Sequence, residues 1–369
     1  MPYIVQGEPT YRPRTNFSKI KFDYKYENGL KLKPGSELHE RLVSEILMRA
    51  TQSRKEVSKR FDSWNEVDRT LNVYIPLADD EKALKEEDST KPISIVFPYT
   101  YSTLESLLTY ITMAFFQDPI FQYEGVDDDD TIGAMLMELV VKMHCIKNKV
   151  PLALHTIFRD CLTYGIGVGI PGWKTVKGKR PIRSKVSSDS EVGGSTQYLV
   201  SYEDDVLFEG NELYSISPYM WLPHVACSSN NIQDMEYFGW VEQSNYMKLL
   251  SAEGQGNDGL FNVKYLSECS HRRSALSLDP SDRDIKTGVS KNVNEITTNP
   301  VDLIKMYVTL IPKEWNLGGS EYPEKWFFCL ASDEVIIQCE RAEHHHGMYP
   351  AAAASSTRAF PLFGVVILK

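Results

Sequence analysis

Apolar residues recur at helical spacing through the first half of the chain. From Ser36 to Thr70 they lie three or four residues apart, after a serine that can cap the first turn, which predicts a long amphipathic helix. A second helix is predicted from 100–102 to Asp118-Pro119, where proline ends it. The pattern further predicts a short strand at 120–123, a helix after Asp127–Asp130 that Pro151 stops, and a helix over 152–164.

From Gly165 the apolar period becomes that of strands. Residues 165–176 and 197–208 predict a hairpin around a polar, mobile loop over 177–196. Residues 326–331 and 334–340 predict a second hairpin across Ser332-Asp333. Further strands are expected at 212–220, 235–243 and 303–311, and the polar segment 251–300 is expected to form a surface excursion. Helices followed by strands indicate an α+β fold with a mainly antiparallel β region.

The same pattern divides the chain into four regions. An irregular N-terminal arm, 1–35, precedes a helical region, 36–164, and a mainly β region, 165–350, while 351–369 form a C-terminal tail. Within that tail Val365 to Leu368 are four consecutive large apolar residues, which favours a strand buried on both faces.

Composition narrows the class of protein. The 369 residues are 42% hydrophobic and 24% charged, enough for a sizeable core and against wholesale disorder. The longest uncharged apolar stretch, 107–117, is too short to span a bilayer, and the N-terminus does not read as a secretory signal. Six cysteines without a C-x-x-C pair indicate synthesis in a reducing, cytosolic compartment.

The net charge is −10 and is unevenly distributed. Residues 1–60 hold 13 Lys and Arg against 7 Asp and Glu, a net +6, so the rest carries −16. An acidic body argues against a surface that wraps nucleic acid. A basic cluster does occur in the predicted loop. It could contact phosphate groups non-specifically, or its side chains could simply be solvated. It consists of Lys177, Lys179, Arg180, Arg183 and Lys185.

Several clusters invite a chemical interpretation, and none predicts a catalytic or metal-binding residue or a cofactor. His344-His345-His346 point alternately to opposite sides of an extended chain, so a solvated loop is favoured over a metal site. Asp127–Asp130 favour the start of a helix over a magnesium site. Glycines at 165, 167 and 169 follow a helix and open a strand, the reverse of a dinucleotide loop. His144, Cys145, His155 and Cys161 match no zinc spacing.

A series of segments in a fixed order resembles the portal proteins of tailed bacteriophages, the head–tail connector family. These are Phe61–Trp64, which end the long helix, and then residues 93–102, 116–121, 159–168, 216–223 and 306–340. Together the resemblance spans roughly residues 36–350 and covers the wing region of such portals. The stem, clip and crown of the family are not evident in this sequence.

The resemblance implies a structural role without enzymatic activity. Portal subunits form a ring, usually of twelve copies, at one vertex of the capsid of the virion. Double-stranded DNA is packaged and ejected through it without sequence-specific contacts, and no membrane is involved. The implied partners are the major capsid protein, the terminase large subunit and then adaptor or tail proteins. The wing helices would pack at the core or between subunits, and Leu42, Ile46, Phe61 and Trp64 are the expected packing residues.

Two alternatives remain at this point. The chain could be another virion scaffold or neck protein without a channel, or a metal-dependent enzyme that uses the cluster at His344–His346. The appearance of the purified protein, as closed rings, monomers or sheets, separates the first alternative from a portal.

Overall fold

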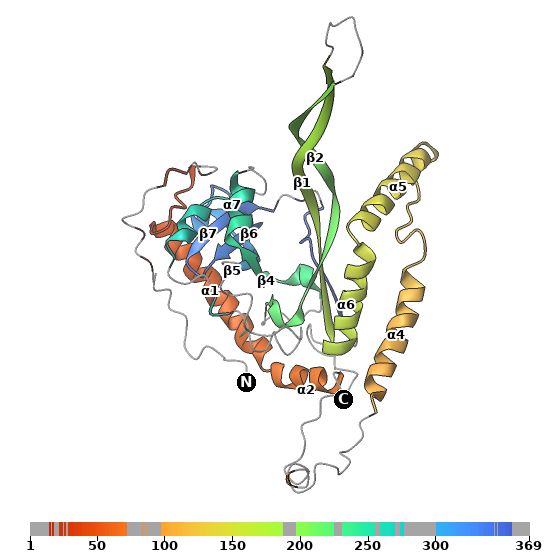
Figure 1. Ribbon diagram of the computed structural model, residues 1–369. Coiled ribbons are helices and arrows are strands. Elements are labelled where there is room, and N and C mark those ends of the chain that lie inside the picture. The colour runs from red at the N-terminus through yellow and green to blue at the C-terminus, as the bar shows by residue number, and fades with distance from the viewer. Residues whose placement is uncertain are drawn as a thin grey trace, which may run out of the picture. The chain divides into compact units, whose positions relative to one another are not determined.

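Figure 1 shows a computed structural model of the protein, in which helices come first and antiparallel strands follow. The predicted α+β class is therefore confirmed. The structure describes residues 15, 17, 22–24, 26, 29–71, 83, 86, 97–186, 197–224, 231–254, 259–269, 274–276, 300–342, 344 and 346–355. The chain forms two compact units. Unit 1 comprises 1–108, 157–168 and 216–369, and unit 2 comprises 109–156 and 169–215.

The long N-terminal helix is present but divided in two. Helix α1 (Glu37–Ser58) begins after Ser36, whose side chain accepts a hydrogen bond from the His39 backbone N–H, as the capping pattern predicts. The helix ends before Lys59-Arg60, and α2 (Phe61–Leu71) continues beyond the break. Of the expected packing residues, Leu42 and Ile46 lie buried on α1, and Phe61 and Trp64 lie buried on α2.

Three more helices lead into the first strand. They are α4 (Tyr99–Phe115), α5 (Thr131–Lys147) and α6 (Val150–Tyr164). Pro151 lies in the first turn of α6, where proline is tolerated. The strand expected at 120–123 is wrong, because these residues form a bend and loop before the short 3-10 turn Asp128–Asp130.

Two glycines carry the chain from α6 into β1 (Ile166–Val186). Gly165 has a φ of +84°, which a side chain would strain. A Cβ added to Gly167 would lie 2.2 Å from the Ile157 carbonyl oxygen, so only glycine lets strand and helix approach this closely. These glycines therefore serve backbone geometry, as the helix-to-strand context predicts.

Strand β1 and its partner β2 (Gln197–Ile216) are longer than expected. Residues 177–186, assigned to a loop from their polarity, belong to β1; residues 187–196 lie outside the described part of the chain. The sheet order is β2-β1-β8, and β8 (Ala352–Ser355) is only four residues long.

The main sheet of unit 1 is an antiparallel meander in the order β3-β4-β5-β6-β7. Its strands are β3 (Trp221–Pro223), β4 (Tyr237–Asn245), β5 (Pro300–Leu310), β6 (Glu324–Ala331) and β7 (Val335–Arg341). A three-residue turn, Ser332–Glu334, joins β6 to β7 and places Ser332 and Asp333 at φ values of 57° and 61°; the predicted hairpin is present, with Glu334 in its turn instead of its second strand.

The main sheet is buried on both faces, and side chains alternate between two cores. Ile304, Met306 and Phe328 pack with the apolar stripe of α1 on one face. Leu303, Cys329 and Ile337 pack on the other face with α7 (Tyr246–Gly254) and the 3-10 helix Val263–Ser267. The described residues 259–269 therefore contradict the expected surface excursion, because Val263, Tyr265 and Leu266 are core residues. Helix α9 (Pro312–Trp315) follows β5.

The predicted strand at 365–368 and most of the N-terminal arm lie outside the described residues. Among the described helices, none combines the length and hydrophobicity needed to cross a bilayer.

Candidate assembly surface

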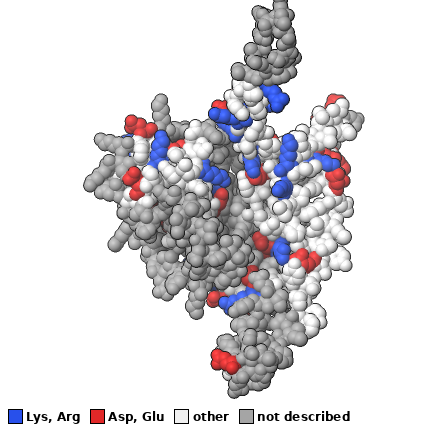
Figure 2. All heavy atoms as spheres, in the orientation of Figure 1, with Lys and Arg blue, Asp and Glu red and all other residues white. Residues whose placement is uncertain are grey.

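Helix α5 exposes its apolar side chains to solvent. Eight large apolar residues of this 17-residue helix are exposed, including Ile132 at 72%, Leu136 at 59% and Leu139 at 64%. The others are Met135, Met137, Val140, Met143 and Ile146. Figure 2 shows an expanse with few charged side chains over this part of the molecule. Clusters of exposed apolar side chains are typical of surfaces that bind another molecule.

The end of α4 that belongs to unit 2 also exposes large apolar side chains. Tyr110, Met113 and Phe115 are exposed, and Phe121 in the loop that follows is exposed as well. This loop is fixed against α5, because Asp118 forms an ion pair with Lys142 at 2.7 Å and the Tyr123 N–H donates to Glu138 at 3.3 Å. The apolar side chains of α4 and α5 thus belong to a connected segment of unit 2.

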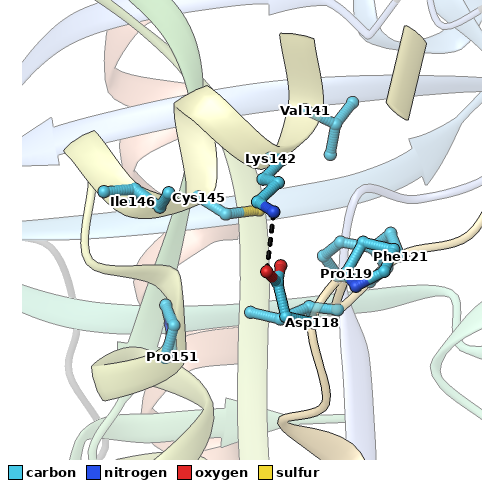
Figure 3. A pocket seen from close by; sticks show the side chains of 9 residues that line it. Asp118, Pro119, Phe121, Val141, Lys142, Cys145, Ile146 and Pro151 are labelled. Atoms are coloured by element: carbon cyan, nitrogen blue, oxygen red, sulfur yellow. Dashed lines mark hydrogen bonds and ion pairs between the residues drawn. The ribbon is translucent and has the colours of Figure 1, made fainter. Parts of the chain in front are cut away.

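A small pocket lies between this loop and the helices (Figure 3). Asp118, Pro119, Phe121, Lys142 and Cys145 line it, and its volume is about 50 Å³. Ligand pockets are typically about 300–1,000 Å³, so this hollow is too small for a cofactor. Burial raises the pKa of the Cys145 thiol, which therefore stays protonated at neutral pH.

His144 holds α5 to the β1–β2 hairpin. It is one of the two buried side chains of this helix, and its ring packs edge-to-face on Trp173 of β1 and Phe208 of β2. The Asn211 backbone N–H donates to its Nδ1 at 3.4 Å, and Asn148 donates to the Asn211 carbonyl oxygen at 2.5 Å. These contacts assign His144 a packing role in unit 2.

The hairpin carries the expected basic cluster, on a strand and beside acidic residues. Lys177, Lys179, Arg180 and Arg183 are exposed on β1; of Lys185 only the backbone position is described. Arg180 pairs with Asp205 of β2 at 3.3 Å, and Lys174 pairs with Glu212 at 3.0 Å. Carboxylates this close offset the attraction of β1 for phosphate.

The histidines near the C-terminus belong to a turn after β7. The rings of His344 and His346 stack with centroids 5.3 Å apart, and His346 Nδ1 accepts from the Met348 N–H. Burial and the charges of His346 and Lys325 lower the pKa of His344. His345 lies outside the described residues, and within those residues no group of three His, Cys, Asp or Glu side chains could hold a metal ion.

The other candidates from the sequence lie in separate places. Asp127 and Asp130 are exposed before α5, and Asp130 occupies its N-cap position without a side-chain hydrogen bond. His155 and Cys161 lie on α6, and burial raises the pKa of Cys161 to about 11. The exposed face of α5 was present in the sequence as an ordinary amphipathic pattern, and only the fold reveals that nothing described covers it.

No protein-family model matches the chain, and no curated protein matches it.

Proposed function

We propose that this chain is a portal subunit, the head–tail connector of a tailed bacteriophage, which forms a ring at one capsid vertex of the virion. Double-stranded DNA would pass through the ring during packaging and ejection. The ring would contact the major capsid protein, the terminase and later the adaptor or tail proteins. The ordered resemblance of residues 36–350 to the wing region suggests this identity.

The observation that carries the proposal is the exposed apolar surface of α5. Burial of a large apolar side chain contributes about 1.5–3 kcal/mol, so several such residues supply ample driving force for association. A ring requires two different, complementary surfaces on each copy, because each copy contacts one neighbour on either side. In unit 2 the apolar face of α5 is exposed, and the hairpin has a basic strand β1 and an acidic strand β2 that are complementary in charge.

The charge balance supports passage of DNA of any sequence. Each Lys or Arg that holds a phosphate adds salt-dependent affinity and would retain the DNA. A net charge of −10, with acidic side chains beside the basic residues of β1, keeps this affinity low.

Negative-stain imaging of the purified full chain tests the proposal. We expect closed rings with a central hole. The double variant Leu136→Glu/Leu139→Glu, on the exposed face of α5, should give monomers that retain the wild-type circular dichroism spectrum. Met247→Glu is the matched control, because Met247 is a 65% exposed apolar residue of α7 in unit 1. Monomers, sheets or open chains of the wild-type protein would contradict a portal and favour a scaffold or neck protein.

A further inference from the structure

The two strands of the β1–β2 hairpin carry opposite charge. Strand β1 contains six Lys and Arg and no Asp or Glu, whereas β2 contains five Asp and Glu and no Lys or Arg. The basic residues are Lys174, Lys177, Lys179, Arg180, Arg183 and Lys185. The acidic residues are Glu203, Asp204, Asp205, Glu209 and Glu212.

Only part of this charge is compensated inside the hairpin. Two ion pairs between described residues join the strands: Lys174 of β1 pairs with Glu212 of β2, and Arg180 of β1 pairs with Asp205 of β2. Lys179, Arg183, Glu203 and Asp204 form no ion pair with any residue that the structure describes. These four are exposed, so each strand retains a pair of charges available to a partner.

The hairpin also exposes apolar side chains, and β1 is the only strand neighbour of β2 among the described residues. Trp173 of β1 and Tyr202 and Leu207 of β2 are 58%, 67% and 56% exposed. A two-stranded ribbon is marginally stable alone, and unpaired edges invite another strand. β1 has 21 residues and β8 only four, so β8 can cover a small part of the outer edge of β1.

Because β1 is basic and β2 is acidic, the hairpins of two copies can pair favourably in one arrangement only. Two hairpins that join edge to edge about a two-fold axis bring β1 beside β1, or β2 beside β2, and place like charges opposite each other. Like charges on directly opposite residues destabilise a strand pair. A head-to-tail contact brings β1 of one copy beside β2 of the next and matches the charges, and such contacts generate rings.

We propose that neighbouring copies of this chain contact each other head to tail through their hairpins, with the basic strand β1 of one copy beside the acidic strand β2 of the next. This inference rests on the proposed ring. It identifies the β1–β2 hairpin as a charged contact between neighbouring subunits. It also gives a role to Lys179, Arg183, Glu203 and Asp204, which the ion pairs within the hairpin do not use.

Charge reversal tests the contact. The variants are Lys179→Glu/Arg183→Glu, which makes β1 more acidic, and Glu203→Lys/Asp204→Lys, which makes β2 more basic. Neither alters the Lys174–Glu212 or Arg180–Asp205 pair. Each variant alone should associate at least about tenfold more weakly than the wild type in sedimentation at low salt. An equimolar mixture of the two, and a single chain with all four substitutions, should both regain wild-type association.

A cross-linking measurement on the wild-type protein gives a readout that does not depend on variants folding. A carbodiimide joins a lysine amine to a carboxylate, so a mixture of ¹⁴N- and ¹⁵N-labelled chains should yield mixed-label links between Lys179 and Glu203 or Asp204. Links confined to one isotope would show a contact within one chain and overturn the proposal. Equal association of all charge variants would also overturn it.

The outcomes separate this contact from the proposed function. If the wild type and the charge-reversal variants form closed rings in equal yield, the hairpin contact is refuted and the portal proposal is not. Open chains that carry the mixed-label links would support the contact and refute the closed ring. A wild-type protein that stays monomeric and yields no such links would refute both.

Discussion

Asp68 accepts hydrogen bonds from two tyrosine hydroxyls, Tyr164 at 2.6 Å and Tyr219 at 2.7 Å. Trp64 packs against both tyrosine rings, and burial together with the Asp68 charge raises the pKa of Tyr164 well above its ordinary value. The Tyr164 hydroxyl therefore stays protonated and can donate. This cluster joins α2 to the end of α6 and to the segment before β3 within unit 1.

Replacement of Trp64 tests how much this cluster contributes to the stability of the folded chain. Trp64 is 1% exposed, so Trp64→Ala should lower the free energy of unfolding by about 3–5 kcal/mol through the lost contacts and the cavity left behind. Ser63→Ala, one residue earlier and exposed, is the matched control and should change it by less than about 0.5 kcal/mol. Denaturant unfolding of both variants measures the difference; equal midpoints would contradict a central role for Trp64.

His39 predicts a specific pH dependence. Its Nε2 accepts from the Ile336 N–H at 3.2 Å, and burial lowers its pKa from 6.5 to about 4. Between these values the unfolded chain binds a proton that the folded chain excludes. The contribution of neutral His39 is thus fully present above pH 6.5 and is lost as the pH falls toward 4, up to about 3 kcal/mol.

His39→Gln provides the control, because a glutamine oxygen can accept the same hydrogen bond without titrating. Thermal unfolding from pH 7.5 to 4.5 should show the wild type losing stability relative to this variant as the pH falls below 6.5. Parallel curves over that range would contradict the assignment.

At the scale of elements, the sequence predicted those caps, helix ends and turns that depend on residues close together in the chain. The Ser36 cap, the end of α4 at Phe115 shortly before Pro119 and the turn at Ser332-Asp333 depend on neighbouring residues only. The continuation of β1 through residues 177–186 could not be predicted, because polar residues there form a strand by pairing with β2. Likewise Tyr265 is buried by strands and N-terminal residues far away in the sequence.

The α6–β1 junction gives a paired test at this scale. Gly167→Ala places a Cβ 2.2 Å from the Ile157 carbonyl oxygen and should destabilise unit 1 by more than about 1 kcal/mol. Gly133→Ala, in α5 with nothing within 4 Å of the new Cβ, should stabilise its helix by about 0.5–1 kcal/mol. Calorimetry of the two variants measures both shifts, and shifts of the same sign would contradict this account.

For the whole molecule, an apolar surface that is covered only on association links stability to concentration. We expect the midpoint of thermal unfolding to rise when the wild-type protein is concentrated a hundredfold, because association removes folded monomer from the unfolding equilibrium. Leu136→Glu/Leu139→Glu should unfold at a midpoint independent of concentration. A constant wild-type midpoint would mean that the exposed face of α5 is not a subunit contact.

The packing of α1 has a consequence for synthesis. His39 and its partner Ile336 lie 297 residues apart in the chain. At about 5–20 residues per second, ribosomes would need about 15–60 seconds to reach β7 after α1 has been made. Until then Leu42, Ile46 and their neighbours lack the complete sheet that covers them in the folded chain. We therefore expect the nascent chain to bind a chaperone at α1, and slower translation of the β region to favour aggregation on the ribosome.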